Sequence, residues 1–112
     1  VALPLRAEFL QGQGRVHGGI VAALADTAAV YLLLAELPRG RTLTSIEFKL
    51  NFLRPATLDA GELVARATLV KRGRTIALVD VEVLQRDDLV AKGLFTYLFS
   101  DRPDPVQIEC ST

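Results

Sequence analysis

Asp26 is the residue of this sequence whose surroundings most suggest chemistry. It stands in "GGIVAALADTAAVYLLLAEL", a segment built almost wholly of Ala, Leu, Val and Ile. This segment begins directly after His17, the only histidine of the chain. A carboxylate is costly to bury unless it is hydrogen-bonded, paired or used in a reaction. A hydroxyl neighbour such as Thr27 could satisfy the group, so Asp26 taken alone is equally compatible with a structural and a catalytic role.

Gly18 and Gly19 open the same segment. Glycines at a helix start would let a substrate approach the main chain, where the first N–H groups have no intrahelical partner. Those donors and the positive end of the helix dipole suit a developing oxyanion, although tight helix packing would also favour glycine. From Gly18 to Asp26 the helix would rise about 12 Å, too far for both residues to touch one carbonyl carbon. In a two-fold dimer with antiparallel helices, Asp26 of one subunit can lie beside Gly18 of the other, so the spacing predicts sites at a homodimer interface.

Periodicity predicts the elements that must position these groups. The apolar segment predicts one helix from about Gly18 to Glu36, since Pro38 cannot continue it and Gly40 permits a turn. A short strand over Leu5–Leu10 and a glycine loop, "QGQGR", are expected before the helix. Four strands are expected after it, joined by turns at "RGR" and "DD", and their segments are "TLTSIEFKLNFLRP", "ELVARATLVK", "TIALVDVEVLQR" and "LVAKGLFTYLF".

The first of these four strands has one apolar face by simple alternation. That face carries Ile46, Phe48, Leu50 and Phe52. The alternating polar residues are Ser45, Glu47, Lys49 and Asn51. A solvated strand face or a contact between dimers would explain the polar set.

Composition restricts the class of protein. The chain of 112 residues has a formal net charge of zero and a pI near 6.8, which is not the charge pattern of a nucleic-acid-binding or membrane-coating protein. We expect one domain over residues 1–100 and a polar tail over 101–112 that holds the lone Cys110. A single cysteine provides neither a disulfide framework nor a metal-ligand cluster, and the N-terminus lacks signal-peptide features, so we expect a cytoplasmic location. Polar interruptions in the run Ile20–Leu37 favour a buried helix over a membrane span.

A helix that is apolar nearly all round must be covered on more than one side. The antiparallel sheet can wrap one side of the helix. A second subunit is the simplest cover for the rest, which predicts an α+β fold in a homodimer.

Four segments together resemble the hotdog-fold acyl-CoA thioesterases, particularly their phenylacetate-pathway (PaaI-like) branch. The segments are "GRVHGGIVAALADTA", "SIEFKLNFLRPA", "VKRGRTIALVDVEV" and "LVAKGLFTYLF". The resemblance implies a hotdog fold, with one long central helix wrapped by an antiparallel sheet of five or six strands. It also implies homodimers that often pair into homotetramers, and hydrolysis of an aryl- or short/medium-chain acyl-CoA to the free acid and CoA. The resemblance implies no metal and no redox cofactor. CoA is part of the substrate and is therefore not counted as a cofactor.

The resemblance also assigns roles in catalysis. The backbone N–H of Gly18 would polarise the thioester carbonyl, and Asp26 of the partner chain would serve as general base or nucleophile. Gln11 stands where many members have an Asn that helps to hold the carbonyl. Ser45 aligns with a serine that assists the attacking water in some members. His17 would orient the loop rather than transfer protons.

Basic residues are the candidates for binding the CoA phosphates. The turn "KRGRT" supplies Lys71, Gly73, Arg74 and Thr75, and Arg54 is a second candidate. Cations at a hairpin tip could equally serve to keep a sheet edge soluble. A non-catalytic acyl-CoA-binding hotdog module is the alternative function, although a pure binder would gain nothing from Asp26. A dehydratase of the same fold would need a differently placed His and acid pair.

Overall fold

Ten elements make up the computed structural model, which describes residues 1–12 and 14–101. In chain order they are β1 (Ala2–Leu3), the 3-10 helix η1 (Ala7–Phe9), β2 (Leu10–Gly12), β3 (Arg15–Val16), α1 (Gly18–Leu34), β4 (Arg41–Phe52), the 3-10 helix η2 (Leu58–Ala60), β5 (Leu63–Arg72), β6 (Ile76–Gln85) and β7 (Asp88–Asp101). Residues 102–112, with Cys110 and most of the expected tail, lie outside the described part.

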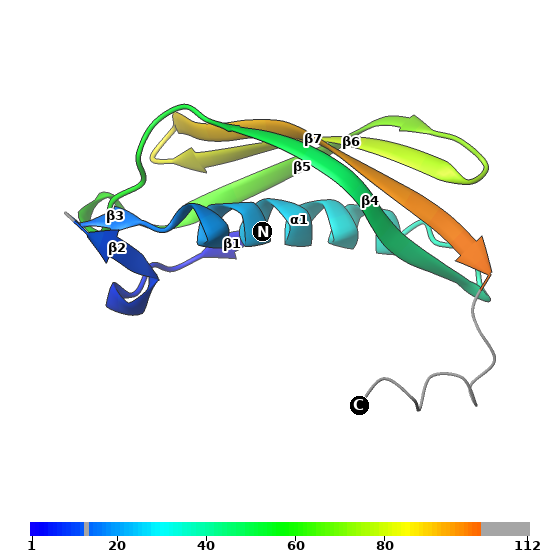
Figure 1. Cartoon of the computed structure of the whole chain (residues 1–112), viewed down its shortest axis with the longest axis horizontal. Helices are drawn as coiled ribbons and strands as arrows, with labels where there is room; N and C mark the ends of the chain where they lie inside the picture. Colours follow the sequence, from blue (N-terminus) through cyan, green and yellow to red (C-terminus); the bar gives the residue numbers. More distant parts are fainter. Residues whose placement is uncertain (13, 102–112) are drawn as a thin grey trace.

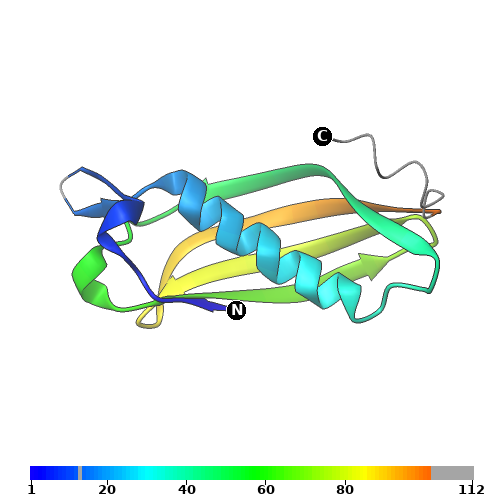
Figure 2. The same ribbon diagram turned by 90° about the horizontal axis from the view of Figure 1, so that it is seen from below.

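One long helix lies across the concave face of a curved antiparallel sheet (Figures 1 and 2). The five strands run in the order β1-β5-β6-β7-β4, so the 12-residue β4 forms one edge. This is the central helix and five-stranded sheet that the sequence predicts. No helix among residues 1–12 and 14–101 is long and apolar enough to cross a membrane.

The core lies between α1 and the inner face of the sheet. Small side chains let the helix approach closely, since Ala25 and Ala29 are completely buried and Ala28 nearly so. The sheet contributes Val79, Val81, Val83, Phe95, Tyr97 and Phe99, all at most 2% exposed. Fully burying a Val, Leu or Phe side chain contributes roughly 1.5–3 kcal/mol, so this layer holds the helix in place.

The prediction of a strand over Leu5–Leu10 is wrong. Residues Ala7–Phe9 form η1, and the strands are β1 and β2 on either side of it. The expected glycine loop is part of a small β2–β3 hairpin, in which Gly12 and Gly14 adopt positive φ values. Strand β1 depends on a distant segment, since it pairs with β5 and the Val1 amine donates to the Ala65 carbonyl. Local alternation cannot encode such pairing.

A β-bulge at Ile46 divides β4 into two halves. Ser45 lies opposite Tyr97 and Glu47 lies opposite Thr96, so Ile46 has no partner on β7. The bulge places Ser45 on the inner face of the sheet with Tyr97, while Glu47 lies on the outer face with Thr96. The predicted common face of Ser45 and Glu47 is therefore wrong, because simple alternation assumes an unbroken strand.

A buried glutamine fixes the loop around η2. The Gln85 side chain is 5% exposed. Its Oε1 accepts from the Thr57 N–H at 3.1 Å, and its Nε2 donates to the carbonyls of Thr57 and Gly61 at 2.7 and 2.8 Å. The side chain thus satisfies three main-chain groups that no strand pairs.

Candidate active site

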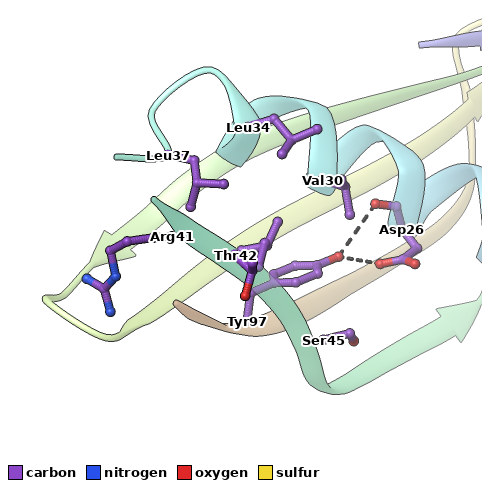
Figure 3. A pocket seen from close by; sticks show the side chains of 9 residues that line it. Asp26, Val30, Leu34, Leu37, Arg41, Thr42, Ser45 and Tyr97 are labelled. Carbon is purple, nitrogen blue, oxygen red and sulfur yellow. Dashed lines mark hydrogen bonds between the residues drawn. The ribbon is translucent and has the colours of Figure 1, made fainter. Parts of the chain in front are cut away.

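Asp26 lies in an apolar cavity between α1, β4 and β7. The cavity has a volume of about 430 Å³. Figure 3 shows its lining, which consists of Asp26, Val30, Leu34, Leu37, Arg41, Thr42, Leu43, Ser45 and Tyr97. The half-buried Asp26 points from the helix towards the sheet, so its carboxylate is available to a molecule in this cavity.

Tyr97 is the hydrogen-bond partner of this carboxylate. The tyrosine is 1% exposed, and its hydroxyl donates to Oδ1 of Asp26 in a short hydrogen bond. The Asp26 carbonyl oxygen is 3.5 Å from the same hydroxyl. Burial, the hydrogen bond to Asp26 and the charge of Asp26 together raise the pKa of Tyr97 well above its ordinary value. Tyr97 therefore stays protonated and acts as a donor.

Tyr97 belongs to the segment "LVAKGLFTYLF", for which the sequence predicted a strand and no further role. A buried tyrosine usually requires a hydrogen-bond partner for its hydroxyl, so a tyrosine in this strand could have indicated that a polar group lies opposite it. The structure finds the partner 71 residues away, on the helix. Thr27, the hydroxyl neighbour considered above, instead donates to the Ala23 carbonyl at 2.8 Å.

Ser45 lines the Asp26 cavity as well. Its partner across the β4–β7 ladder is Tyr97, so the two side chains are neighbours on the face that meets α1. Figure 3 shows the Ser45 side chain below the Tyr97 ring and hydroxyl in this view. The structure thus brings together Asp26 and Ser45 among the predicted catalytic residues, and adds Tyr97 to them.

The start of α1 lines a second cavity, of about 530 Å³. Four of the predicted site residues line it: Gln11, His17, Gly18 and Arg54. His17 caps the helix, since its Nδ1 accepts from the Gly19 N–H at 2.9 Å. Within the described residues, the Gly18 N–H donates to no acceptor. The free donor at Gly18 and the acceptor role of His17 suit the roles predicted for these two residues.

Asp26 and Gly18 line different cavities within one chain. Asp26 lies eight positions after Gly18 in α1, which corresponds to about 12 Å along the helix axis. Within one chain, the Asp26 carboxylate and the Gly18 amide therefore do not face one cavity.

The basic candidates are spread over both ends of the helix. Lys71, Gly73, Arg74 and Thr75 line neither of these two cavities. Their turn lies at the C-terminal end of α1, where Arg72 donates to the Glu36 carbonyl at 3.1 Å. Arg54, at the opposite end, forms an ion pair with Asp88 at 2.8 Å. Within one chain the turn "KRGRT" therefore lies far from Gly18 and Gly19.

Solved structures of other proteins share this architecture. A Bacillus halodurans protein crystallised with CoA is 27% identical and superposes with a TM-score of 0.84, over 88% of this chain and 65% of its own. A phenylacetic acid degradation-related protein from Ralstonia eutropha is 35% identical, with a TM-score of 0.81 over 87% of this chain and 72% of its own. Both neighbours support the fold that the sequence predicted.

Sequence comparison leads to the same group of proteins. Human acyl-coenzyme A thioesterase 13 is 28% identical over 96 residues, which cover 84% of this chain and 67% of the human protein. A relative from Halobacterium salinarum is 35% identical over 79 residues, and this chain spans about half (50%) of its length. The profile of the thioesterase superfamily matches residues 13–92. With its central helix, its curled five-stranded sheet and this match, the chain belongs to the thioesterase superfamily and has the hotdog fold.

Proposed function

We propose that this chain hydrolyses an acyl-CoA thioester, at sites formed between two copies of the chain. The observation that carries the proposal is the hydrogen-bonded Asp26 carboxylate in an apolar cavity, with the free Gly18 amide in a separate one. The CoA in the Bacillus halodurans structure and the name of the human relative support acyl-CoA as the substrate class. The mostly apolar lining of the Asp26 cavity suits an aryl or a short- to medium-chain acyl group.

Unpaired apolar surface supports the second copy. Strand β4 is an edge, and apolar side chains remain exposed along it and along α1: Tyr31, Leu34, Ile46, Phe48, Phe52 and Leu53. A long apolar edge strand invites pairing with another strand. Antiparallel pairing of two β4 edges about a two-fold axis would set the two α1 helices antiparallel and move Asp26 of one copy towards Gly18 of the other.

The reaction needs a donor to the carbonyl oxygen and a base or nucleophile at the carbonyl carbon. The Gly18 N–H would bind the thioester oxygen and stabilise the negative charge that develops there. Asp26 of the other copy would either take a proton from the attacking water or attack the carbon itself. The C–S bond then breaks, and CoA leaves as the thiolate and takes up a proton. In the general-base route the acyl group is released directly as the free acid. After direct attack it remains on Asp26 as a mixed anhydride, which a water molecule hydrolyses to the free acid.

The experiment is a hydrolysis panel of aromatic and aliphatic acyl-CoAs, followed by release of free thiol. We expect turnover of at least one substrate, and a loss of about 100-fold to 10,000-fold in kcat for Asp26→Asn with an unchanged fold. A wild-type protein that binds acyl-CoA but never releases thiol would instead support the non-catalytic binding module. Full turnover by the Asp26→Asn variant would show that Asp26 is structural.

A further inference from the structure

We propose that Tyr97 is a positioning residue for catalysis, which holds Oδ1 of Asp26 and leaves Oδ2 as the oxygen that reacts. The inference rests on the proposed hydrolysis and goes beyond it, because it concerns how one oxygen of the carboxylate is selected. Its basis is the geometry of the hydrogen bond between β7 and α1 (Figure 3).

The position of the Tyr97 hydroxyl is set by the sheet. Across the ladders the tyrosine faces two small residues, Ser45 on β4 and Ala77 on β6, and Ala77 is completely buried. Along β7 the next residues on the same face are Phe95 and Phe99, both at most 2% exposed. A ring enclosed in this way cannot change rotamer without disrupting the core. The hydroxyl is therefore a fixed point, and the Asp26 side chain is oriented by it.

Among residues 1–12 and 14–101, the Asp26 carboxylate has one hydrogen-bond partner. Among the described residues, Tyr97 is the one side chain that donates to it, and the donation goes to Oδ1. Oδ2 has no protein donor within the same residues and belongs to a group that lines the cavity. With water as the attacking group, Oδ2 takes the proton of water while the new C–O bond forms. With direct attack, Oδ2 itself forms the bond to the carbonyl carbon as the C–S bond breaks, and a water molecule then hydrolyses the mixed anhydride. Both routes use the same oxygen.

The ionisable groups around the Asp26 cavity leave the hydrogen bond from Tyr97 to Asp26 in place. The ionisable residues that line the cavity are Asp26, Tyr97 and Arg41. The Arg41 guanidinium is occupied elsewhere, since it donates to the carbonyls of Arg74 and Phe99 at 3.1 and 2.8 Å. Burial and the neighbouring carboxylate keep the pKa of Tyr97 raised, so its proton stays on the phenol oxygen. The hydroxyl donates to Asp26 and does not act as a base.

Kinetics of Tyr97→Phe test the positioning role. This change removes the hydroxyl and keeps the ring, so we expect kcat to fall about tenfold to a hundredfold while KM changes by less than about twofold. Thr96→Val is the matched control, because it removes a hydroxyl from the next residue of β7, on the outer face, and should leave both constants unchanged. An unchanged kcat in Tyr97→Phe, or an equal loss in Thr96→Val, would overturn the proposal.

A spectrum recorded at neutral pH tests the contact without any turnover. The chain has two tyrosines, so Tyr97 is the only one left in a Tyr31→Phe background, and its near-ultraviolet absorbance can be recorded alone. A phenol that donates to a carboxylate absorbs at longer wavelength than one with a weaker, neutral acceptor, so adding Asp26→Asn should move the Tyr97 band to shorter wavelength. An unmoved band would show that the two residues are not in contact, whatever the acyl-CoA panel finds. A moved band with no acyl-CoA hydrolysis would overturn the proposed function and, with it, the positioning role of Tyr97.

Discussion

Gly18 and Asp26 belong to one helix but line two different cavities, and the helix between them rises about 12 Å. Gly18 does not line the cavity that contains the Asp26 carboxylate, and none of the described residues that line the Gly18 cavity carries a carboxylate. This separation is the physical reason for expecting a site shared by two subunits, and it allows a direct test of the sharing.

Two inactive variants should restore activity to each other. Asp26→Asn lacks the carboxylate, and Gly18→Val places a branched side chain at the free amide, where even a Cβ atom would lie 3.4 Å from the Phe52 ring. If each site takes Gly18 from one chain and Asp26 from the other, a mixed dimer holds one intact and one doubly damaged site. Refolding equal amounts together should therefore give about a quarter of wild-type activity, since half of the dimers are mixed.

Exchange of subunits must be shown by mass spectrometry for the mixture to be informative. The two unmixed proteins, refolded separately and then assayed together, provide the control and should remain inactive. An inactive mixture with confirmed exchange would mean that both groups act within one chain, which contradicts the shared site.

Ser45→Ala should slow turnover, whereas Thr44→Ala should not. The bulge at Ile46 leaves Ser45 opposite Tyr97 in the Asp26 cavity, while Thr44 lies opposite Leu98 on the outer face. A hydroxyl beside the carboxylate can hold an attacking water, so its loss should lower kcat about tenfold. The two variants differ by one position in the same strand, and equal rates for both would exclude a role for Ser45.

Gln85→Leu should lower the free energy of unfolding by about 1–3 kcal/mol, because buried main-chain groups lose their hydrogen-bond partner. The substitution leaves the Thr57 amide and the carbonyls of Thr57 and Gly61 without the side chain that satisfies them. Gln85→Glu is the matched variant, because a carboxylate can still accept from Thr57 but cannot donate to the two carbonyls. Urea denaturation of all three proteins measures the effect, and wild-type stability in Gln85→Glu would show that the donated bonds contribute little.

Stability should fall in alkaline solution, in part because of Tyr97. The raised pKa keeps Tyr97 protonated in the folded protein, whereas a tyrosine of the unfolded chain loses its proton near pH 10, its ordinary value. Above about pH 10 the folded state therefore binds more protons than the unfolded state, and the free energy of unfolding decreases as pH rises. Below that range the contribution is fully present.

Denaturant titrations at several alkaline pH values measure this slope. The slope should be shallower in Tyr97→Phe than in the wild type. Tyr31→Phe is the control, since Tyr31 is 60% exposed and does not line the Asp26 cavity. The same slope in all three proteins would contradict the link between Tyr97 ionisation and folding.

Local features of the sequence determined the helix, the long strands and the family. A largely apolar segment that ends before Pro38 predicts a helix that stops close to that point, and the structure ends it at Leu34. Alternation over ten or more residues predicts β4, β5, β6 and β7, because the side chains of a strand alternate between its two faces. The spacing of Gly18 and Asp26 is likewise a local property, since a helix has a fixed rise per residue.

Tertiary structure decided what surrounds the carboxylate. Ser45 faces Asp26 only because one extra residue, Ile46, is accommodated in β4 when that strand pairs with β7. Tyr97 reaches Asp26 across 71 residues of sequence because β7 lies beneath the middle of α1. The short strand β1 forms where a distant segment, β5, supplies its partner. Each of these features depends on which strands meet and in which register, and long-range pairing is set by the packing of the whole chain rather than by local residue patterns.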